Sequence, residues 1–114
     1  MENKFFTFNQ NNSGGRFVVD KSEGICECVI IEAKNAEQAN EIAEKIGIYF
    51  NGVDNDRDCP CCGDRWYDVD DRDGKDEPSF YGDPISKATA SLFVDNVFVH
   101  YLDGTFKEFK LKGN

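Results

Sequence analysis

Three of the five cysteines stand close together in the segment Cys59-Pro60-Cys61-Cys62-Gly63. Cys59 and Cys62 are three positions apart, a spacing at which two thiolates can bind one metal ion if the backbone makes a tight turn. Pro60 fixes φ at the start of such a turn, and Gly63 permits a positive φ at its end. The segment therefore predicts a pair of metal-binding thiolates, with Cys61 as the variable position.

Written as C-P-x-C-G, these residues resemble the zinc knuckle of zinc-ribbon and rubredoxin-like proteins. The resemblance covers five residues and implies a pair of zinc ligands, without a fold or an activity. A structural zinc ion takes four ligands. We expect the second pair from Cys26 and Cys28, which share one face if their stretch is a strand, with His100 as an alternative ligand. Four sulfurs would leave no open position, so this zinc would be structural rather than catalytic.

Other interpretations of these residues stay open. Cys26 and Cys28 are also explained as small hydrophobic residues buried on a strand. The C-x-x-C spacing also suits a redox dithiol, although no thioredoxin-like βαβ pattern surrounds it. His100 falls in the middle of an expected strand, where histidine is more often structural than a ligand or a base.

The negative charge is concentrated in an acidic, turn-rich middle segment, residues 51–86. From Asp54 to Asp83 there are eleven acidic and four basic residues, whereas the rest of the chain has a net charge of −2. The aspartates do not continue as an EF-hand, because Cys59 stands where the calcium loop needs glycine. A solvated loop, a weak divalent-cation site and an acidic surface for a basic partner all remain open. A zinc ion would hold down a segment this polar.

Strand-like patterns lie on both sides of the middle segment, at 4–9, 16–20, 25–33, 88–94, 97–102 and 105–111. One helix is expected after the third strand. Asn35 is a good N-cap, Gln38 occupies the N3 position of a capping box, and Gly47 suits the C′ position. We predict an α+β fold in which an antiparallel sheet of about six strands packs on one main helix, with an acidic, cysteine-containing insertion.

Length and charge exclude several classes of protein. The 114 residues are expected to form one domain, 1–114, and 39% hydrophobic residues suffice for a packed core. A net charge of −9 disfavours direct binding to nucleic acid or to an anionic membrane. No run of 18 apolar residues and no signal-peptide pattern is present, so we expect a cytoplasmic protein whose cysteines are free or metal-bound.

Arg65, Trp66 and Tyr67 follow the cysteines directly. Such residue types dominate binding hot spots, so the three are candidates for an exposed anchor for a partner, although Trp66 and Tyr67 are also explained as core aromatics. Together with Arg16 they are also candidates to enclose a nucleotide-like molecule through charge and stacking.

The stretch from Ile31 to Tyr81 resembles a family of small uncharacterised accessory proteins of tailed bacteriophages. The resemblance is carried by IEAKNAEQANEIAEKIGIYFNGV and by CPCCGDRWYD, and it covers about half of the chain. It implies an infected bacterial cytoplasm and action on host functions, including defence systems, by binding. No catalytic residues come with it.

The leading hypothesis is therefore a small non-catalytic binding protein that modulates or inhibits a host protein by stoichiometric binding. The alternative is a sponge that sequesters a nucleotide-like signal. A metal-assisted hydrolase using His100 and clustered aspartates lacks a recognisable geometry, and a virion component is a further possibility. Exposed strand edges and an odd cysteine permit a homodimer.

Overall fold

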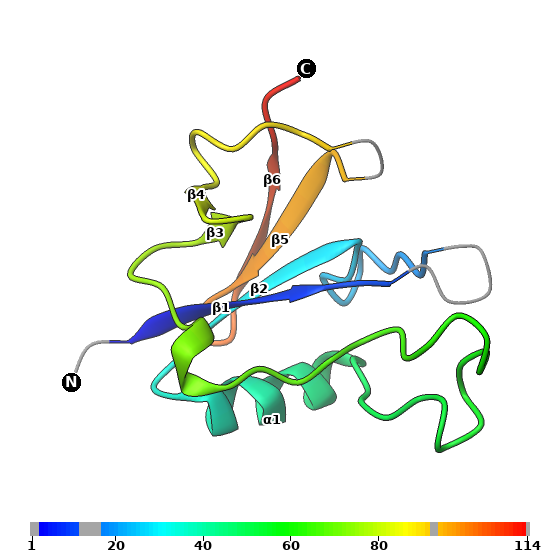
Figure 1. Cartoon of the computed structure of the whole chain (residues 1–114). Coiled ribbons are helices and arrows are strands. Elements are labelled where there is room, and N and C mark those ends of the chain that lie inside the picture. The colour runs from blue at the N-terminus through cyan, green and yellow to red at the C-terminus, as the bar shows by residue number, and fades with distance from the viewer. Residues whose placement is uncertain (1–2, 12–16, 92–93, 114) are drawn as a thin grey trace.

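A four-stranded mixed sheet lies at the centre of the computed structural model, which describes residues 3–11, 17–91 and 94–113 (Figure 1). The strand order is β1-β2-β5-β6, and one helix, α1 (Ala36–Ile46), lies beside the sheet. The sheet strands are β1 (Lys4–Asn9), β2 (Cys28–Ala33), β5 (Asn96–His100) and β6 (Phe106–Lys110). A separate small hairpin pairs β3 (Ser79–Phe80) with β4 (Asp83–Pro84).

The predicted six-stranded antiparallel sheet is wrong. β1 pairs antiparallel with β2, and β5 with β6, but β2 and β5 are parallel. The parallel pair arises because the chain leaves β2 through α1 and the middle segment before it returns beside β2, and such a crossover connects parallel strands. Local sequence patterns reveal hairpins, and they do not reveal which distant strand lies next to β2.

Two of the expected strands are not formed in the part of the chain that the structure describes. In residues 17–20 only Asp20 makes a bridge, to Ile25, and in residues 88–91 only Thr89 does, to Lys112. Arg16 and residues 92–93 of these two predicted strands lie outside the described residues, and Val94 is described but is not part of a strand. Ala88 and Ala90 are instead buried against the sheet, so their apolar pattern reflects burial rather than strand pairing.

The helix prediction is confirmed. The Asn35 side chain accepts a hydrogen bond from the backbone N–H of Gln38 at 2.8 Å, and Gly47 ends the helix with φ of 113°. In a capping box, the Gln38 side chain would accept the backbone N–H of Asn35. Here it accepts the backbone N–H of Lys34 instead, one residue earlier, at 2.7 Å. The hairpin of β5 and β6 and the strand β1 are likewise as predicted.

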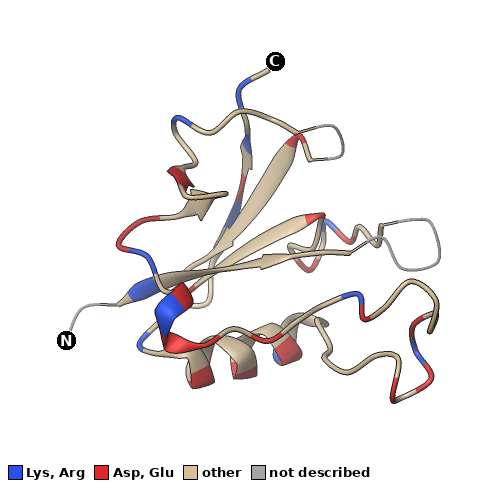
Figure 2. Cartoon of the chain, viewed as in Figure 1, with Lys and Arg blue, Asp and Glu red and all other residues tan. Residues whose placement is uncertain are grey.

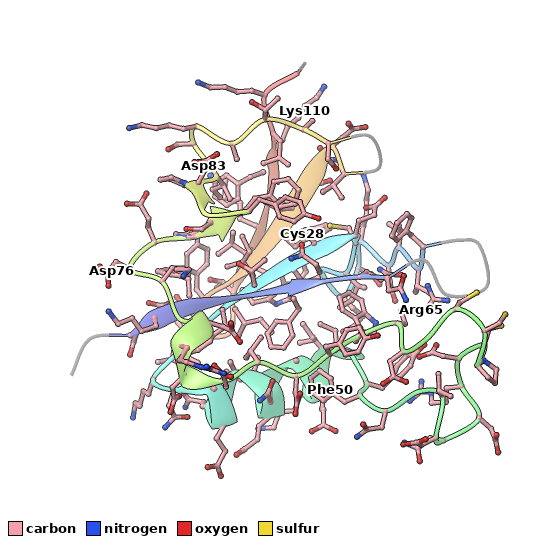
Figure 3. The ribbon with its side chains drawn as sticks, in the orientation of Figure 1. Cys28, Phe50, Arg65, Asp76, Asp83 and Lys110 are labelled. Carbon is pink, nitrogen blue, oxygen red and sulfur yellow. The ribbon has the colours of Figure 1, made fainter. Side chains whose placement is uncertain are left out.

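Both faces of the sheet are covered. On β2, Val29 and Ile31 face the cluster that includes α1, whereas Cys28 and Ile30 face the opposite cluster, which includes Phe80 of β3. Figure 3 shows Cys28 within the sheet and Phe50 on the side of α1. Burial on two faces explains why β2 reads as a continuous apolar run instead of an alternating one.

The middle segment runs back along α1 (Figure 1) and is tied to it by side chains. Asn40 of α1 exchanges two hydrogen bonds of 3.0 Å with the backbone of Val69. Asp71 accepts the backbone N–H of Ala36 at 2.9 Å and so satisfies one donor at the start of the helix. Figure 2 shows acidic residues along both α1 and this segment. Among the described residues, no helix has the length and apolarity to cross a bilayer.

Candidate metal centre

Cys59, Cys61 and Cys62 form a thiol cluster on a loop of the middle segment. Their three sulfur atoms all lie within 4.8 Å of one another. The Sγ of Cys61 is 2.7 Å from that of Cys59 and 3.8 Å from that of Cys62. Cys61 and Cys62 are exposed, and Cys59 is half-buried. The cluster is therefore close enough to hold a metal ion and accessible from solvent.

A tight backbone turn brings the three sulfurs together. The backbone N–H groups of Cys62 and Gly63 both donate to the carbonyl of Cys59 at 3.1 Å. Gly63 has φ of 85°, in the left-handed region where residues with a Cβ are strained. The predicted turn, with glycine at its end, is confirmed.

The thiols of the cluster differ in acidity because they hydrogen-bond to one another. The pKa of Cys59 lies below its ordinary value, since the Cys61 thiol and then the Cys61 backbone donate hydrogen bonds to the Cys59 thiolate. The pKa of Cys61 rises to about 11, because its S–H is the donor to Cys59 and to Cys62. Cys59 is thus the thiol that ionises before Cys61, and a thiolate is the form that binds metal.

The sulfur spacing suits a soft cation. In a tetrahedral site with Zn–S bonds of about 2.3 Å, neighbouring sulfurs are about 3.8 Å apart. The separation of Cys61 and Cys62 is already 3.8 Å, whereas Cys59 and Cys61 would have to move apart from 2.7 Å. Three sulfurs fill three of four tetrahedral positions, and the group found among the described residues has no fourth member. The arrangement can therefore bind a thiophilic ion and leave one coordination position open.

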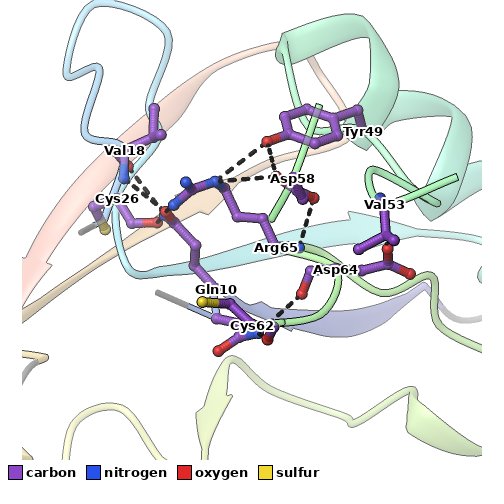
Figure 4. A network of polar contacts seen from close by, with 10 residues as sticks. Gln10, Val18, Cys26, Tyr49, Val53, Asp58, Cys62, Asp64 and Arg65 are labelled. Carbon is purple, nitrogen blue, oxygen red and sulfur yellow. Dashed lines mark hydrogen bonds and ion pairs between the residues drawn. The ribbon is translucent and has the colours of Figure 1, made fainter. Parts of the chain in front are cut away.

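A buried ion pair forms the base of this loop (Figure 4). One carboxylate oxygen of Asp58 accepts the backbone N–H of Arg65 at 2.8 Å, and the other accepts the hydroxyl of Tyr49 at 2.7 Å. The Nε of Arg65 lies 3.7 Å from the same Asp58 oxygen and donates to the Tyr49 hydroxyl at 3.2 Å. The Asp58 side chain has no exposed surface. The two ends of the loop are thereby locked together.

The same network ties the loop to the end of β1. The guanidinium of Arg65 donates to the side chain of Gln10 at 2.8 Å. The side chain of Asn11 donates to the carbonyl of Cys62 at 2.8 Å, and its backbone N–H donates to the carbonyl of Arg65 at 2.8 Å. These protein groups therefore help to hold down the segment, and the same role for zinc stays a prediction.

The expected second pair of ligands does not join the cluster. Cys26 and Cys28 are buried, and the Cys26 thiol donates to the carbonyl of Cys28 at 3.2 Å. Burial raises the pKa of Cys26 to about 11 and raises that of Cys28 as well. His100 is also elsewhere, with its Nε2 2.8 Å from the carbonyl of Gly24. Cys61, which we expected to be the variable position, is instead the third member of the thiol cluster. The C-x-x-C pattern counts only Cys59 and Cys62, so it does not reveal the role of the cysteine between them.

The residues expected to form a binding anchor differ in their exposure to solvent. Trp66 is buried in the core beside α1, and Arg65 is buried in the polar network (Figure 4). Only Tyr67 of the three has an exposed ring, with 57% of its surface accessible. Arg16 lies outside the described residues. Asp58 was missed because nothing in a run of aspartates marks the one that becomes buried.

One protein family matches the chain. Its model, described as "Domain of unknown function (DUF7296)", covers residues 3–114 and so includes the sheet, the helix and the thiol cluster. No curated protein and no solved structure matches the chain.

Proposed function

Since the chain belongs to the DUF7296 family, whose description assigns no activity, we propose its function from the thiol cluster. The protein is a small, acidic, non-catalytic binding protein that holds one zinc ion on an exposed loop. The observation that carries this proposal is the approach of three cysteine sulfurs to within 4.8 Å on a turn that the protein itself holds in place.

Zinc is proposed because thiolates select soft or borderline ions, and zinc accepts three sulfurs with a fourth ligand of another kind. A catalytic zinc site would use the fourth position for water and needs a nearby base. Among the described residues, no histidine or carboxylate groups with the three sulfurs. We therefore propose that the open position serves binding, and that a side chain of a partner protein fills it.

The proposed partner is a host protein in a bacterial cytoplasm. This part of the proposal is motivated by the resemblance to phage accessory proteins, by the small size and by the acidic middle segment. Stoichiometric binding would modulate or inhibit that host factor. Expression of the protein in a bacterium without any effect on growth or on defence, and without a co-purifying host protein, would remove the basis of this part.

No feature of the described residues favours the alternative of a nucleotide sponge. Arg65 is already paired with Asp58, and Trp66 is part of the core, so neither is available to a ligand without disrupting the protein. Of Arg65, Trp66 and Tyr67, only Tyr67 offers a stacking surface.

The test is a zinc titration in competition with a chromophoric chelator. Wild-type protein is expected to bind one zinc ion per chain, and Cys59→Ser, Cys61→Ser and Cys62→Ser are each expected to weaken binding about tenfold or more, because each removes a thiolate ligand. Cys26→Ala is the matched control and is expected to keep the wild-type affinity, since Cys26 lies away from the cluster. Equal binding by a variant with all three serines would overturn the proposal.

A further inference from the structure

The edge of the sheet at β1 has an unpaired stretch between two paired ends. The backbone N–H of Gln10 donates to the carbonyl of Glu27, just beyond the paired part of β1 and β2. In an antiparallel pair, every second residue makes the hydrogen bonds to the neighbouring strand. The main-chain groups of Phe6 and Phe8 therefore bond to β2, whereas those of Thr7 and Asn9 face the free edge. On that edge Phe5 pairs with Lys75, and Asn11 donates to Arg65. Between these ends, no other described residue hydrogen-bonds to the backbone of Thr7 or Asn9.

A groove of about 370 Å³ lies along this unpaired stretch. It exists because the backbone of the middle segment pairs with the β1 edge at Arg65 and at Lys75 and arches away from it in between. Beyond Lys75 the Thr7 hydroxyl donates to the carbonyl of Ser79 at 2.8 Å, so only the main-chain groups of Thr7 stay free. Thr7 and Asn9 line the groove, and Tyr67 and Tyr81 also line it. These two tyrosines are the most exposed large hydrophobic side chains of the described residues, at 57% and 75%.

The conformation of Tyr81 is a second observation at this groove. Tyr81 has φ of 51°, in the left-handed region that bulky side chains rarely adopt, within the turn between β3 and β4. Its ring packs edge-on against buried Phe80, with ring centroids 4.5 Å apart. Tyr81 and Gly82 are the two residues of this tight turn and both have positive φ, as a two-residue hairpin requires. The turn places an exposed aromatic ring in the groove beside the free main-chain groups of β1.

We propose that this groove binds a short, extended, basic segment of a partner protein by adding it as a strand to the edge of β1. Strand addition uses free main-chain groups for affinity and flanking pockets for side-chain selection. Only two residues of β1 are free, so the added strand is short and belongs to a chain end or a loop tip. The basic character follows from Asp68 and Asp73, which line the groove against one cation, Lys75. The segment that contributes them carries further acidic residues (Figure 2).

This inference deepens the partner binding proposed above but is independent of metal, so it is tested without zinc. The probes are a tetrapeptide, acetyl-Val-Lys-Val-Lys-amide, its Val-Glu counterpart, and a form of the first that is methylated on every peptide nitrogen. Amide NMR spectra of the full chain are expected to shift at Thr7, Asn9, Tyr67 and Tyr81 with the first peptide only. Hydrogen exchange of the Thr7 and Asn9 amides, fast in the free protein, is expected to slow on binding.

Two proline variants each remove one outward-facing backbone N–H, on opposite edges of the sheet. Asn9→Pro removes a donor that faces the groove without breaking the ladder to β2, and is expected to weaken peptide binding about tenfold. Glu108→Pro makes the same change on the opposite edge of the sheet, in β6, where the N–H also faces outward, and is expected to leave binding unchanged. Equal binding of the methylated or the glutamate peptide would overturn the proposal. A dimeric free protein in which the Thr7 and Asn9 amides are already protected would overturn it too, because a second copy would then fill the groove.

Discussion

The carboxylate of Asp58 accepts the backbone N–H of Arg65 at 2.8 Å, and its other oxygen lies 3.7 Å from the Nε of the Arg65 guanidinium. These two residues flank the thiol cluster in sequence, so their pairing closes the cysteine loop at its base. Gly52 packs against Asp58 so tightly that an added Cβ would come 1.8 Å from the Asp58 carboxylate. The loop is thus preformed by protein contacts, and this determines what a bound metal can contribute.

Removal of the Asp58 carboxylate is expected to destabilise the whole fold. Asp58→Ala removes the buried carboxylate that the Arg65 guanidinium faces, which is expected to lower the free energy of unfolding by about 3 kcal/mol. Urea denaturation of wild type and variant measures this change. Asp54→Ala changes an exposed aspartate just before this loop; it is the control and is expected to stay within about 0.5 kcal/mol of wild type. A similar small change for Asp58→Ala would show that the pair does not hold the loop.

Removal of metal is expected to leave the fold intact. In zinc fingers the metal supplies the folding energy, and chelators unfold them. Here Asp58, Arg65 and Asn11 hold the loop without metal. After treatment with EDTA, the far-UV circular dichroism spectrum is expected to match that of the zinc-loaded protein. An unfolded spectrum after chelation would mean that the sulfurs, rather than the ion pair, organise the middle segment.

Zinc affinity is expected to rise with pH. Binding replaces thiol protons, and Cys61, with a pKa of about 11, is still protonated at neutral pH, whereas Cys59 with its lowered pKa gives up its proton more readily. Because more than one proton is displaced, the apparent affinity is expected to increase more than about tenfold for each pH unit between about pH 6 and 8. Titrations at several pH values in the same buffer strength measure the slope. A slope near zero would rule out thiol ligands.

Acidification is expected to destabilise the protein through His100. Burial disfavours its imidazolium form and lowers its pKa below 6.5. Below pH 6.5, the pKa of histidine in the unfolded chain, the unfolded chain takes up a proton that folded His100 does not yet bind. The stability contributed by neutral His100 is therefore present above pH 6.5 and is lost as the pH falls through the pKa of His100 in the folded protein. Urea denaturation at about pH 7 and pH 5 is expected to show a larger loss for wild type than for His100→Gln. Equal losses would assign the pH dependence to other groups.

Local features of the fold were predictable from the sequence, and non-local ones were not. Asn35, Gln38 and Gly47 define the ends of α1 through bonds within a few residues, so the helix follows from the sequence. The parallel pairing of β2 with β5 joins residues about seventy positions apart, as in Ile30 with Val99, and no local pattern encodes it. The apolar segment around Ala88 and Ala90 has the composition of a strand because it is buried against the sheet, and burial and strand pairing select the same residue types.

The candidate site was likewise predictable only where it depends on residues close together in the sequence. The turn at Cys59 and Cys62 follows from local spacing together with Gly63. The participation of Cys61 depends on its side-chain direction, which a spacing rule does not give. The exclusion of Cys28 depends on the burial of β2 on both faces, and that of Cys26 on its burial just before β2; both are properties of the whole fold.

The most direct test of the metal centre is X-ray absorption spectroscopy at the zinc edge of the loaded protein. The account predicts three sulfur neighbours at about 2.3 Å and one lighter atom, oxygen or nitrogen, in the fourth position. A shell of four sulfurs would bring back the ligand set that includes Cys26 or Cys28, and a shell without sulfur would place the ion away from the thiol cluster; either result contradicts the account.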